Sequence, residues 1–396
     1  MPSPLPRAEP ADLGLCPERT QRLVQALQAE VDRNRLPGAV VLLARHGRVV
    51  LNAGVGTLDP ARDLPMTPDA IFRIYSMTKP VVSVATMMLV EQGRLLLSDP
   101  VAKHLPEFSG QQVAVETPDG LQLQPVAQPA TVQDLLRHTA GLTYEFLGEA
   151  PVQRLYAQAQ MGSRERSNAE FSRTLAALPL FRQPGTEWAY SRATDVLGRL
   201  IEVITGQPLG RYLQDAILRP LGMHDTGFAV PPAQHGRIAE PFAHDPDGGT
   251  PMRLIDPREQ PALEMGGGGL MSTVGDYARF LQCLLNGGVL DGMRLLSPRT
   301  VEYMTSDHLG TLTCAPGDPL LPPGHGFGLG FAVRTAPGVS HMAGSVGTYH
   351  WSGIGGTSFF VDPAEDFFGI FLAQAPNQRE HYRALFRNMA YGALVD

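Results

Sequence analysis

Residues 72–80 read Phe-Arg-Ile-Tyr-Ser-Met-Thr-Lys-Pro, and the interpretation of the whole chain begins with Ser76 and Lys79 in this stretch. The apolar run that follows, residues 81–90, is predicted to form a buried helix. Pro80 fits such a helix only in its first turn, because proline has no backbone N–H to donate. Ser76 is therefore expected at the start of the helix. Residues three apart share a helix face, so the Lys79 amine is expected to reach the Ser76 hydroxyl.

Lysine is nearly absent from the chain, which makes its presence here informative. Only two of the 32 Lys and Arg residues are lysines, Lys79 and Lys103. An arginine side chain essentially never loses its proton, whereas a lysine can act as a base once burial lowers its pKa from about 10.4. A hydroxyl next to such an amine is the serine–lysine form of nucleophilic catalysis. The pattern predicts that Ser76 is a nucleophile and Lys79 its base.

The composition excludes several classes of protein. The chain has 396 residues, of which 43% are hydrophobic, enough for a large core or two domains. The net charge of −7 and the lack of a basic stripe argue against nucleic-acid binding. Three scattered cysteines favour a reducing compartment over disulfides or zinc. No apolar run reaches about 18 residues and no signal segment is evident, so we expect a cytoplasmic protein without membrane partners.

Strand patterns lie at both ends of the chain, and helical patterns lie mainly between them. Strands are expected over residues 39–45, 48–53, 328–334, 357–361 and 367–375. Helices are expected over residues 18–35, 131–141, 168–178, 193–205, 210–218, 273–285, 297–304 and 378–394. Residues 111–130 read as a loop or short hairpin, and residues 228–262 as a long loop. This order predicts an α/β domain from residues 1–83 and 263–396, a mainly helical domain from residues 84–262, and an active site at their junction.

Two tyrosines are candidates for proton transfer. Tyr190 ends a turn-rich segment just before a predicted helix, and Tyr144 follows the end of another helix. A tyrosine hydroxyl can accept or relay a proton when a nearby cation favours the phenolate. From the local sequence alone, an ordinary half-buried tyrosine is the favoured interpretation of each.

Five motifs in a fixed order connect these residues to a known superfamily. They are Ser76-Met77-Thr78-Lys79, His138-Thr139-Ala140-Gly141-Leu142, Tyr190-Ser191, Gly267-Gly268-Gly269-Leu270-Met271-Ser272 and Trp351-Ser352-Gly353. The set resembles the serine β-lactamase and penicillin-binding-protein superfamily on its class C side, and most of all the family VIII carboxylesterases. The resemblance spans about residues 15–390. It implies an α/β fold of the β-lactamase/transpeptidase type, with an antiparallel sheet flanked by helices beside a mainly helical domain.

The resemblance also implies roles for individual residues. Ser76 matches the covalent nucleophile, and Lys79 and Tyr190 match the groups that share proton transfer. The oxyanion hole of the superfamily corresponds to the backbone N–H groups of Ser76 and Ile354. Tyr144 matches a tyrosine of the esterase site that orients substrate or steadies the Lys79 network.

Two positions depart from the β-lactamase pattern, and both are expected to contact substrate. Trp351 stands where the β-lactamases have the lysine of their third motif, so an apolar wall replaces a cation that helps to bind a carboxylate. Ser352 and Gly353 complete that motif. Arg192 stands where the β-lactamases have an asparagine that contacts the substrate amide. Both departures favour neutral esters.

We therefore expect a serine hydrolase that cleaves short-chain carboxylic esters, small-molecule substrates, through an acyl-enzyme. No metal or organic cofactor is expected. Three alternatives remain open: a β-lactamase or D-Ala-D-Ala peptidase, an acyltransferase, and a non-catalytic ligand-binding member of the superfamily. A weak β-lactamase side activity and assembly as a homodimer also remain open.

Overall fold

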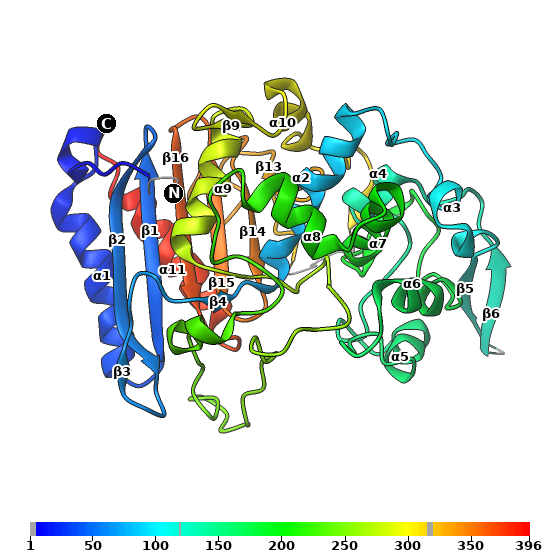
Figure 1. Cartoon of the computed structure of the whole chain (residues 1–396), viewed down its shortest axis with the longest axis horizontal. Coiled ribbons are helices and arrows are strands. Elements are labelled where there is room, and N and C mark those ends of the chain that lie inside the picture. The colour runs from blue at the N-terminus through cyan, green and yellow to red at the C-terminus, as the bar shows by residue number, and fades with distance from the viewer. Residues whose placement is uncertain (1–4, 119, 315–319) are drawn as a thin grey trace.

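The computed structural model describes residues 5–118, 120–314 and 320–396. Its centre is an eight-stranded antiparallel sheet with the strand order β12-β13-β14-β15-β16-β1-β2-β3 (Figure 1). The strands are β1 (Gly38–Arg45), β2 (Arg48–Asp59), β3 (Leu64–Pro65), β12 (His325–Phe327), β13 (Ala332–Arg334), β14 (Tyr349–Gly353), β15 (Thr357–Asp362) and β16 (Phe367–Ala373). Because β16 pairs with β1, the last third of the chain closes the sheet against its first sixty residues.

Helices cover the two faces of this sheet. Strand β1 is buried along its whole length, as expected for a strand with helices on both sides. Its side chains alternate between the faces. Val40 and Leu42 belong to the core cluster that includes α2 (Thr78–Glu91) and α9 (Val274–Leu285). On the other face, α1 (Pro17–Asp32) and α11 (Arg379–Gly392) pack against Val41 and Leu43.

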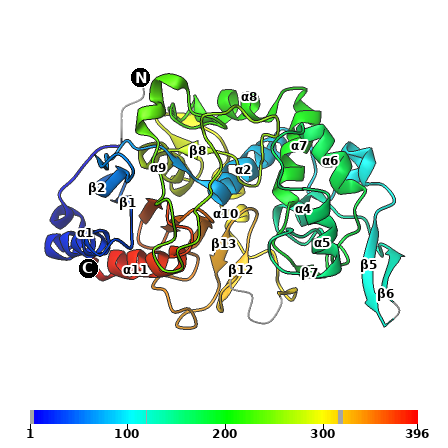
Figure 2. The ribbon, with the colours of Figure 1, turned by 90° about the horizontal axis from the view of Figure 1, so that it is seen from below.

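Five of the remaining helices form a second region beside the sheet (Figure 2). They are α3 (Val101–His104), α4 (Val132–Leu136), α5 (Pro151–Gln158), α6 (Asn168–Ala176) and α7 (Ala193–Thr205). Helices α8 (Leu209–Leu213) and α10 (Pro298–Met304) lie closer to the sheet (Figure 1). The hairpin of β5 (Gln112–Thr117) and β6 (Gly120–Pro125) projects from the outer end of this region. Helix α2 lies between the sheet and α7 and is buried on nearly all sides (Figure 1). The helix that follows the nucleophile thus connects the two regions.

Most elements lie where the sequence predicts them. The turn His46-Gly47 joins β1 to β2 with both residues at positive φ, 51° and 73°, the backbone twist that a tight hairpin needs. The capping box at Thr131 begins α4. The strand expected over residues 328–334 is shorter, however, and pairs only over Ala332–Arg334. No sequence pattern predicted α5 or the three-residue strand β12.

The sheet takes its strands from both ends of the chain. The domain limits at residues 83/84 and 262/263 remain a prediction. Residues 1–4, which begin the segment expected to lack a secretion signal, lie outside the described residues, as does the side chain of Cys314. Cys16 and Cys283 are free thiols.

Candidate active site

Ser76 lies in the short 3₁₀ turn Tyr75–Met77, directly before α2. Its Oγ lies 3.2 Å from Nζ of Lys79 and 2.7 Å from the hydroxyl of Tyr190. The structure thus brings together the three residues expected to carry the chemistry. Lys79 reaches Ser76 from the first turn of α2, and Tyr190 reaches it from the segment that leads into α7.

The residue before the nucleophile is strained. Tyr75 has a backbone φ of +44°, in a region that residues other than glycine rarely adopt. Its hydroxyl accepts a hydrogen bond from the backbone N–H of Ile255 at 3.1 Å, which fixes the ring. Gly355 leaves room for that ring, because a Cβ there would lie 2.7 Å from it. Strain of this kind persists only where the surroundings enforce it, and it is concentrated at functional sites.

Lys79 is fully buried, and this burial decides its protonation. Desolvation lowers its pKa from 10.5 to about 7; the charge of Asp195 opposes this shift and that of Arg192 adds to it. Nζ donates to the carbonyl of Gly267 at 2.6 Å and to the hydroxyl of Tyr144 at 3.0 Å. A neutral amine has two N–H donors, so these two acceptors leave its lone pair free. Near pH 7 a substantial fraction of Lys79 can therefore accept a proton.

Tyr190, unlike Lys79, is favoured in its protonated form. Burial raises its pKa above the ordinary value, while hydrogen bonds with Ser76 and Trp351 act in the other direction. The indole Nε1 of Trp351 donates to the Tyr190 hydroxyl at 3.3 Å, and Nζ of Lys79 lies 4.5 Å from the centre of the tyrosine ring. His138 packs on the same ring at 4.8 Å between centroids. Tyr190 therefore holds its proton at neutral pH.

Strand β14 lies beside the nucleophile, and the residues of β14 nearest to it are the expected third motif, residues 351–353. Gly353 packs against the turn before Ser76, since a Cβ there would lie 2.4 Å from the carbonyl oxygen of Ile74. Only Tyr349 and His350 of β14 pair with β13, so residues 351–353 have no partner strand on that edge among the described residues. Ile354 follows the strand directly and is 42% exposed. The predicted partner of the Ser76 N–H in the oxyanion hole thus adjoins this unpaired edge of the strand.

Arg192 lies buried beside Tyr144 and is held by carboxylates. Its side chain is only 6% exposed and forms ion pairs with Glu145 and, at 3.5 Å, with Asp195. The guanidinium lies 4.8 Å from the centre of the Tyr144 ring. Its charge is thus already matched by two carboxylates, and it supports Tyr144 and the surroundings of Lys79; its expected contact with substrate stays a prediction.

Asp195 is the member of the site that the sequence analysis missed. Its Oδ1 accepts a hydrogen bond from the backbone N–H of Gly267 at 2.8 Å, and the carbonyl of the same glycine holds Lys79. A Cβ at position 267 would lie 2.8 Å from Oδ2 of Asp195 and 3.0 Å from the Tyr144 hydroxyl. The glycine-rich motif is thus needed for close approach of backbone to side chains.

The described residues offer neither a cluster of metal ligands nor a helix that could span a membrane. No group of three or more His, Cys, Asp or Glu side chains is arranged to hold a metal ion within residues 5–118, 120–314 and 320–396. In the same ranges, every helix is too short or too polar to cross a membrane.

Comparison with known proteins agrees with this geometry. Residues 21–393 match the protein family described as beta-lactamase. Esterase EstB from Burkholderia gladioli is 34% identical over 370 residues, with 87% of each chain covered. Lovastatin esterase from Penicillium rubens is 30% identical over 377 residues, covering 88% of this chain and 91% of that protein. The solved structure of EstCE1, described as a hydrolase with promiscuous acyltransferase activity, has a TM-score of 0.81 at 28% identity and covers 94% of this chain and 98% of its own.

These matches confirm the fold class and the resemblance that the five motifs indicated. The chain belongs to the beta-lactamase family, in the part of the serine β-lactamase and penicillin-binding-protein superfamily that includes the family VIII esterases.

Proposed function

We propose that the chain is a carboxylesterase of family VIII that hydrolyses short-chain esters through an acyl-enzyme on Ser76. The observation that carries this proposal is the pair of contacts at the Ser76 Oγ, 3.2 Å to Lys79 and 2.7 Å to Tyr190. The esterase relatives support hydrolysis as the reaction class.

In the acylation step, Lys79 acts first, as the base. Neutral Lys79 takes the proton of the Ser76 hydroxyl as Oγ attacks the ester carbonyl. The backbone N–H groups of Ser76 and Ile354 stabilise the oxyanion, and one such donor is typically worth about 3–4 kcal/mol in the transition state. Tyr190 still holds its proton and gives it to the departing alkoxide. The resulting phenolate is stabilised by the Trp351 N–H and by the Lys79 ammonium next to its ring.

Deacylation runs through the same groups in reverse order. The Tyr190 phenolate takes a proton from water, and the hydroxide attacks the acyl carbonyl. Ser76 then leaves with the proton that Lys79 stored, which restores the starting state. The protonation of the two groups supports Lys79 as the first proton acceptor and Tyr190 as the first donor.

An acyltransferase remains the second candidate, because EstCE1 is described as a hydrolase with promiscuous acyltransferase activity. The chemistry differs only in the acceptor, which would be an alcohol in place of water. A β-lactamase activity is weaker as a candidate, because Trp351 supplies no cation. The free thiols of Cys16 and Cys283 favour a reducing compartment, and we propose the cytoplasm as the location.

A series of p-nitrophenyl esters from acetate to octanoate, assayed on the wild type and on Ser76→Ala, tests the proposal. We expect the highest kcat/KM for short acyl chains and a loss of at least a thousandfold in the variant. Fluorophosphonate labelling followed by peptide mass spectrometry should place the adduct on Ser76. Ester hydrolysis that survives Ser76→Ala would refute the mechanism, and a wild type that neither turns over nor is labelled would favour the non-catalytic alternative.

A further inference from the structure

The segment before the nucleophile holds a residue of a distant loop by its backbone. Ile255 lies 180 residues beyond Tyr75 in the chain. Its carbonyl accepts a hydrogen bond from Nε of Arg73 at 2.6 Å, and its N–H donates to the Tyr75 hydroxyl at 3.1 Å. Arg73 ends the short strand β4 (Phe72–Arg73), and Tyr75 begins the nucleophile turn. Both backbone polar groups of Ile255 are therefore bound by residues that lead directly to Ser76.

Arg73 also holds the beginning of the same loop. Its side chain is only 4% exposed. Nη1 donates to the carbonyl of Ala239 at 2.8 Å, and Nη2 forms an ion pair with Glu240 at 2.8 Å. Hydrogen bonds from a charged guanidinium are stronger than neutral ones and fix the geometry of their acceptors. One buried arginine thus attaches both ends of the segment 239–255 to β4.

Tyr75 lies beside both expected oxyanion donors. The N–H of Ser76 belongs to the planar peptide group that follows Tyr75, so the backbone angles of Tyr75 set the direction of that N–H. The Tyr75 ring lies against Gly355, where a Cβ would come within 2.7 Å of it, and Gly355 follows Ile354. Tyr75 is thus bonded to one donor residue and packed against the neighbour of the other.

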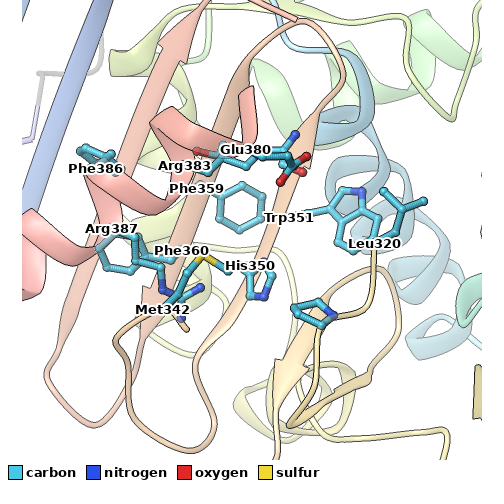
Figure 3. Close-up of a pocket in the computed structure, with 13 residues that line it drawn as sticks. Leu320, Met342, His350, Trp351, Phe359, Phe360, Glu380, Arg383, Phe386 and Arg387 are labelled. Carbon is cyan, nitrogen blue, oxygen red and sulfur yellow. The ribbon is translucent and has the colours of Figure 1, made fainter. Parts of the chain in front are cut away.

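Helix α11 holds the other side of the turn at Ile354. Arg383 extends from α11 over β14 (Figure 3), and its Nη2 donates to the carbonyl of Gly353 at 3.2 Å. Gly353 and Gly355 flank Ile354, so the turn is held just before and just after that residue. Because Ile354 is 42% exposed, its position depends on these flanking contacts more than on burial of its own side chain.

The positive φ of Tyr75 needs support from its surroundings. A residue with a side chain keeps a φ of +44° only where neighbouring groups enforce it. Two contacts of the Tyr75 side chain do so: the hydrogen bond from Ile255 and the packing of the ring on Gly355. Burial raises the pKa of Tyr75, so its side chain remains an uncharged hydroxyl at neutral pH.

We propose that Tyr75 is a positioning residue for the oxyanion hole and that the loop of residues 239–255 acts through it. Held by Ile255, Tyr75 keeps the N–H of Ser76 aimed at the developing oxyanion and steadies the turn that carries the N–H of Ile354. This inference rests on the proposed acyl-enzyme mechanism. It gives the loop a role in turnover without contact with the reacting atoms.

Tyr75→Phe removes the hydroxyl and keeps the ring against Gly355. Acylation and deacylation both pass through an oxyanion, so both should slow together. We expect kcat for p-nitrophenyl butyrate to fall about tenfold, by the same factor from pH 6 to pH 9, and KM to stay within about twofold. Tyr382→Phe is the matched control, because it removes the same atom from a buried tyrosine whose hydroxyl lies 3.5 Å from Glu30 on the far face of the sheet. Its kcat should match that of the wild type.

A thionoester shows whether the lost rate belongs to the oxyanion. Sulfur accepts hydrogen bonds weakly, so turnover of p-nitrophenyl thionobutyrate depends less on the two N–H donors, and Tyr75→Phe should slow it less than about threefold. Hydrogen exchange over residues 250–258 should become faster in this variant, because the N–H of Ile255 loses its acceptor. An unchanged kcat, or equal losses for ester and thionoester, would overturn the inference and leave the esterase function intact. A wild type that turns over neither substrate would instead contradict the proposed function.

Glu240→Gln tests the loop without changing the nucleophile turn. The variant loses the charge that pairs with Arg73, so one end of the loop should loosen. We expect kcat to fall about threefold in the single variant and to fall no further when Glu240→Gln is added to Tyr75→Phe, because the connection through the hydroxyl is already broken. A single variant with wild-type kcat, or losses that multiply in the double variant, would refute the role of the loop.

Discussion

Asp195 and Lys79 are joined through a single peptide group. The carboxylate accepts the N–H of Gly267 at 2.8 Å, and the carbonyl of the same residue accepts Nζ of Lys79 at 2.6 Å. A buried negative charge thus holds the backbone that positions the base, and it also raises the pKa of Lys79 against the effect of burial. Both the position and the basicity of Lys79 therefore depend on one buried carboxylate.

Asp195→Asn separates these two effects. The amide oxygen can still accept the Gly267 N–H, but the charge that favours protonated Lys79 is gone. The pKa of Lys79 should fall, so the acidic limb of the kcat/KM profile should move to lower pH. Asp195→Ala removes the hydrogen bond as well and should lower kcat/KM about 10- to 100-fold at every pH. An unchanged pH profile in Asp195→Asn would mean that the carboxylate has only a structural role.

Burial of Lys79 should cost stability. Its pKa is about 7 in the folded chain and 10.5 as the ordinary value. Between these values the unfolded chain binds a proton that the folded chain has released, so the free energy of unfolding rises as the pH rises from 7 to 10.5. Lys79→Met removes this penalty and should raise the melting temperature by a few degrees at pH 6–7, with the difference shrinking towards pH 10.5.

Calorimetry at pH 6, 8 and 10 checks this expectation. Lys103→Met is the control, because Lys103 is half exposed and forms an ion pair with Asp99 at 2.6 Å. It should show no comparable gain at pH 6. Equal melting temperatures of Lys79→Met and wild type across the range would contradict the burial penalty.

Patterns of nearby residues predicted the features that depend only on contacts between nearby residues. Ser76 and Lys79 meet because they are three residues apart, and the capping box at Thr131 begins its helix for the same kind of reason. Asp195 could not be found in this way, because its partner Gly267 comes from a loop 72 residues further along the chain. The ion pair of Arg192 could not be found either, because its partner Glu145 lies 47 residues earlier.

The placement of α11 over β14 shows the same limit. Arg383 and Arg387 lie on a helix that the sequence predicts well, one turn apart on the same face. That this face covers the active-site strand follows only from the closure of the sheet, which pairs β16 with β1. Long-range pairing decides such sites, and a single sequence does not reveal it.

Tyr190→Phe should affect esters according to their leaving groups. The variant keeps the ring between His138 and Trp351 but loses the proton that the mechanism delivers to the alkoxide. General acid catalysis typically contributes 10²–10⁴-fold. We expect a loss in this range for ethyl esters and a much smaller loss for p-nitrophenyl esters, whose leaving group needs no proton. Equal losses for the two leaving groups would argue that Tyr190 acts in another step.

Gly353→Ala should disrupt the junction between β14 and the nucleophile turn. The new Cβ would lie 2.4 Å from the Ile74 carbonyl and 2.3 Å from Oγ1 of Thr357, so the strand or the turn must shift. Either shift moves the Ile354 N–H away from the oxyanion position, and we expect kcat to fall at least a hundredfold. Gly392→Ala is the control, since a Cβ there meets no atom within 4 Å. Retained kcat in Gly353→Ala, with a melting temperature like that of the control, would show that β14 does not supply the second oxyanion donor.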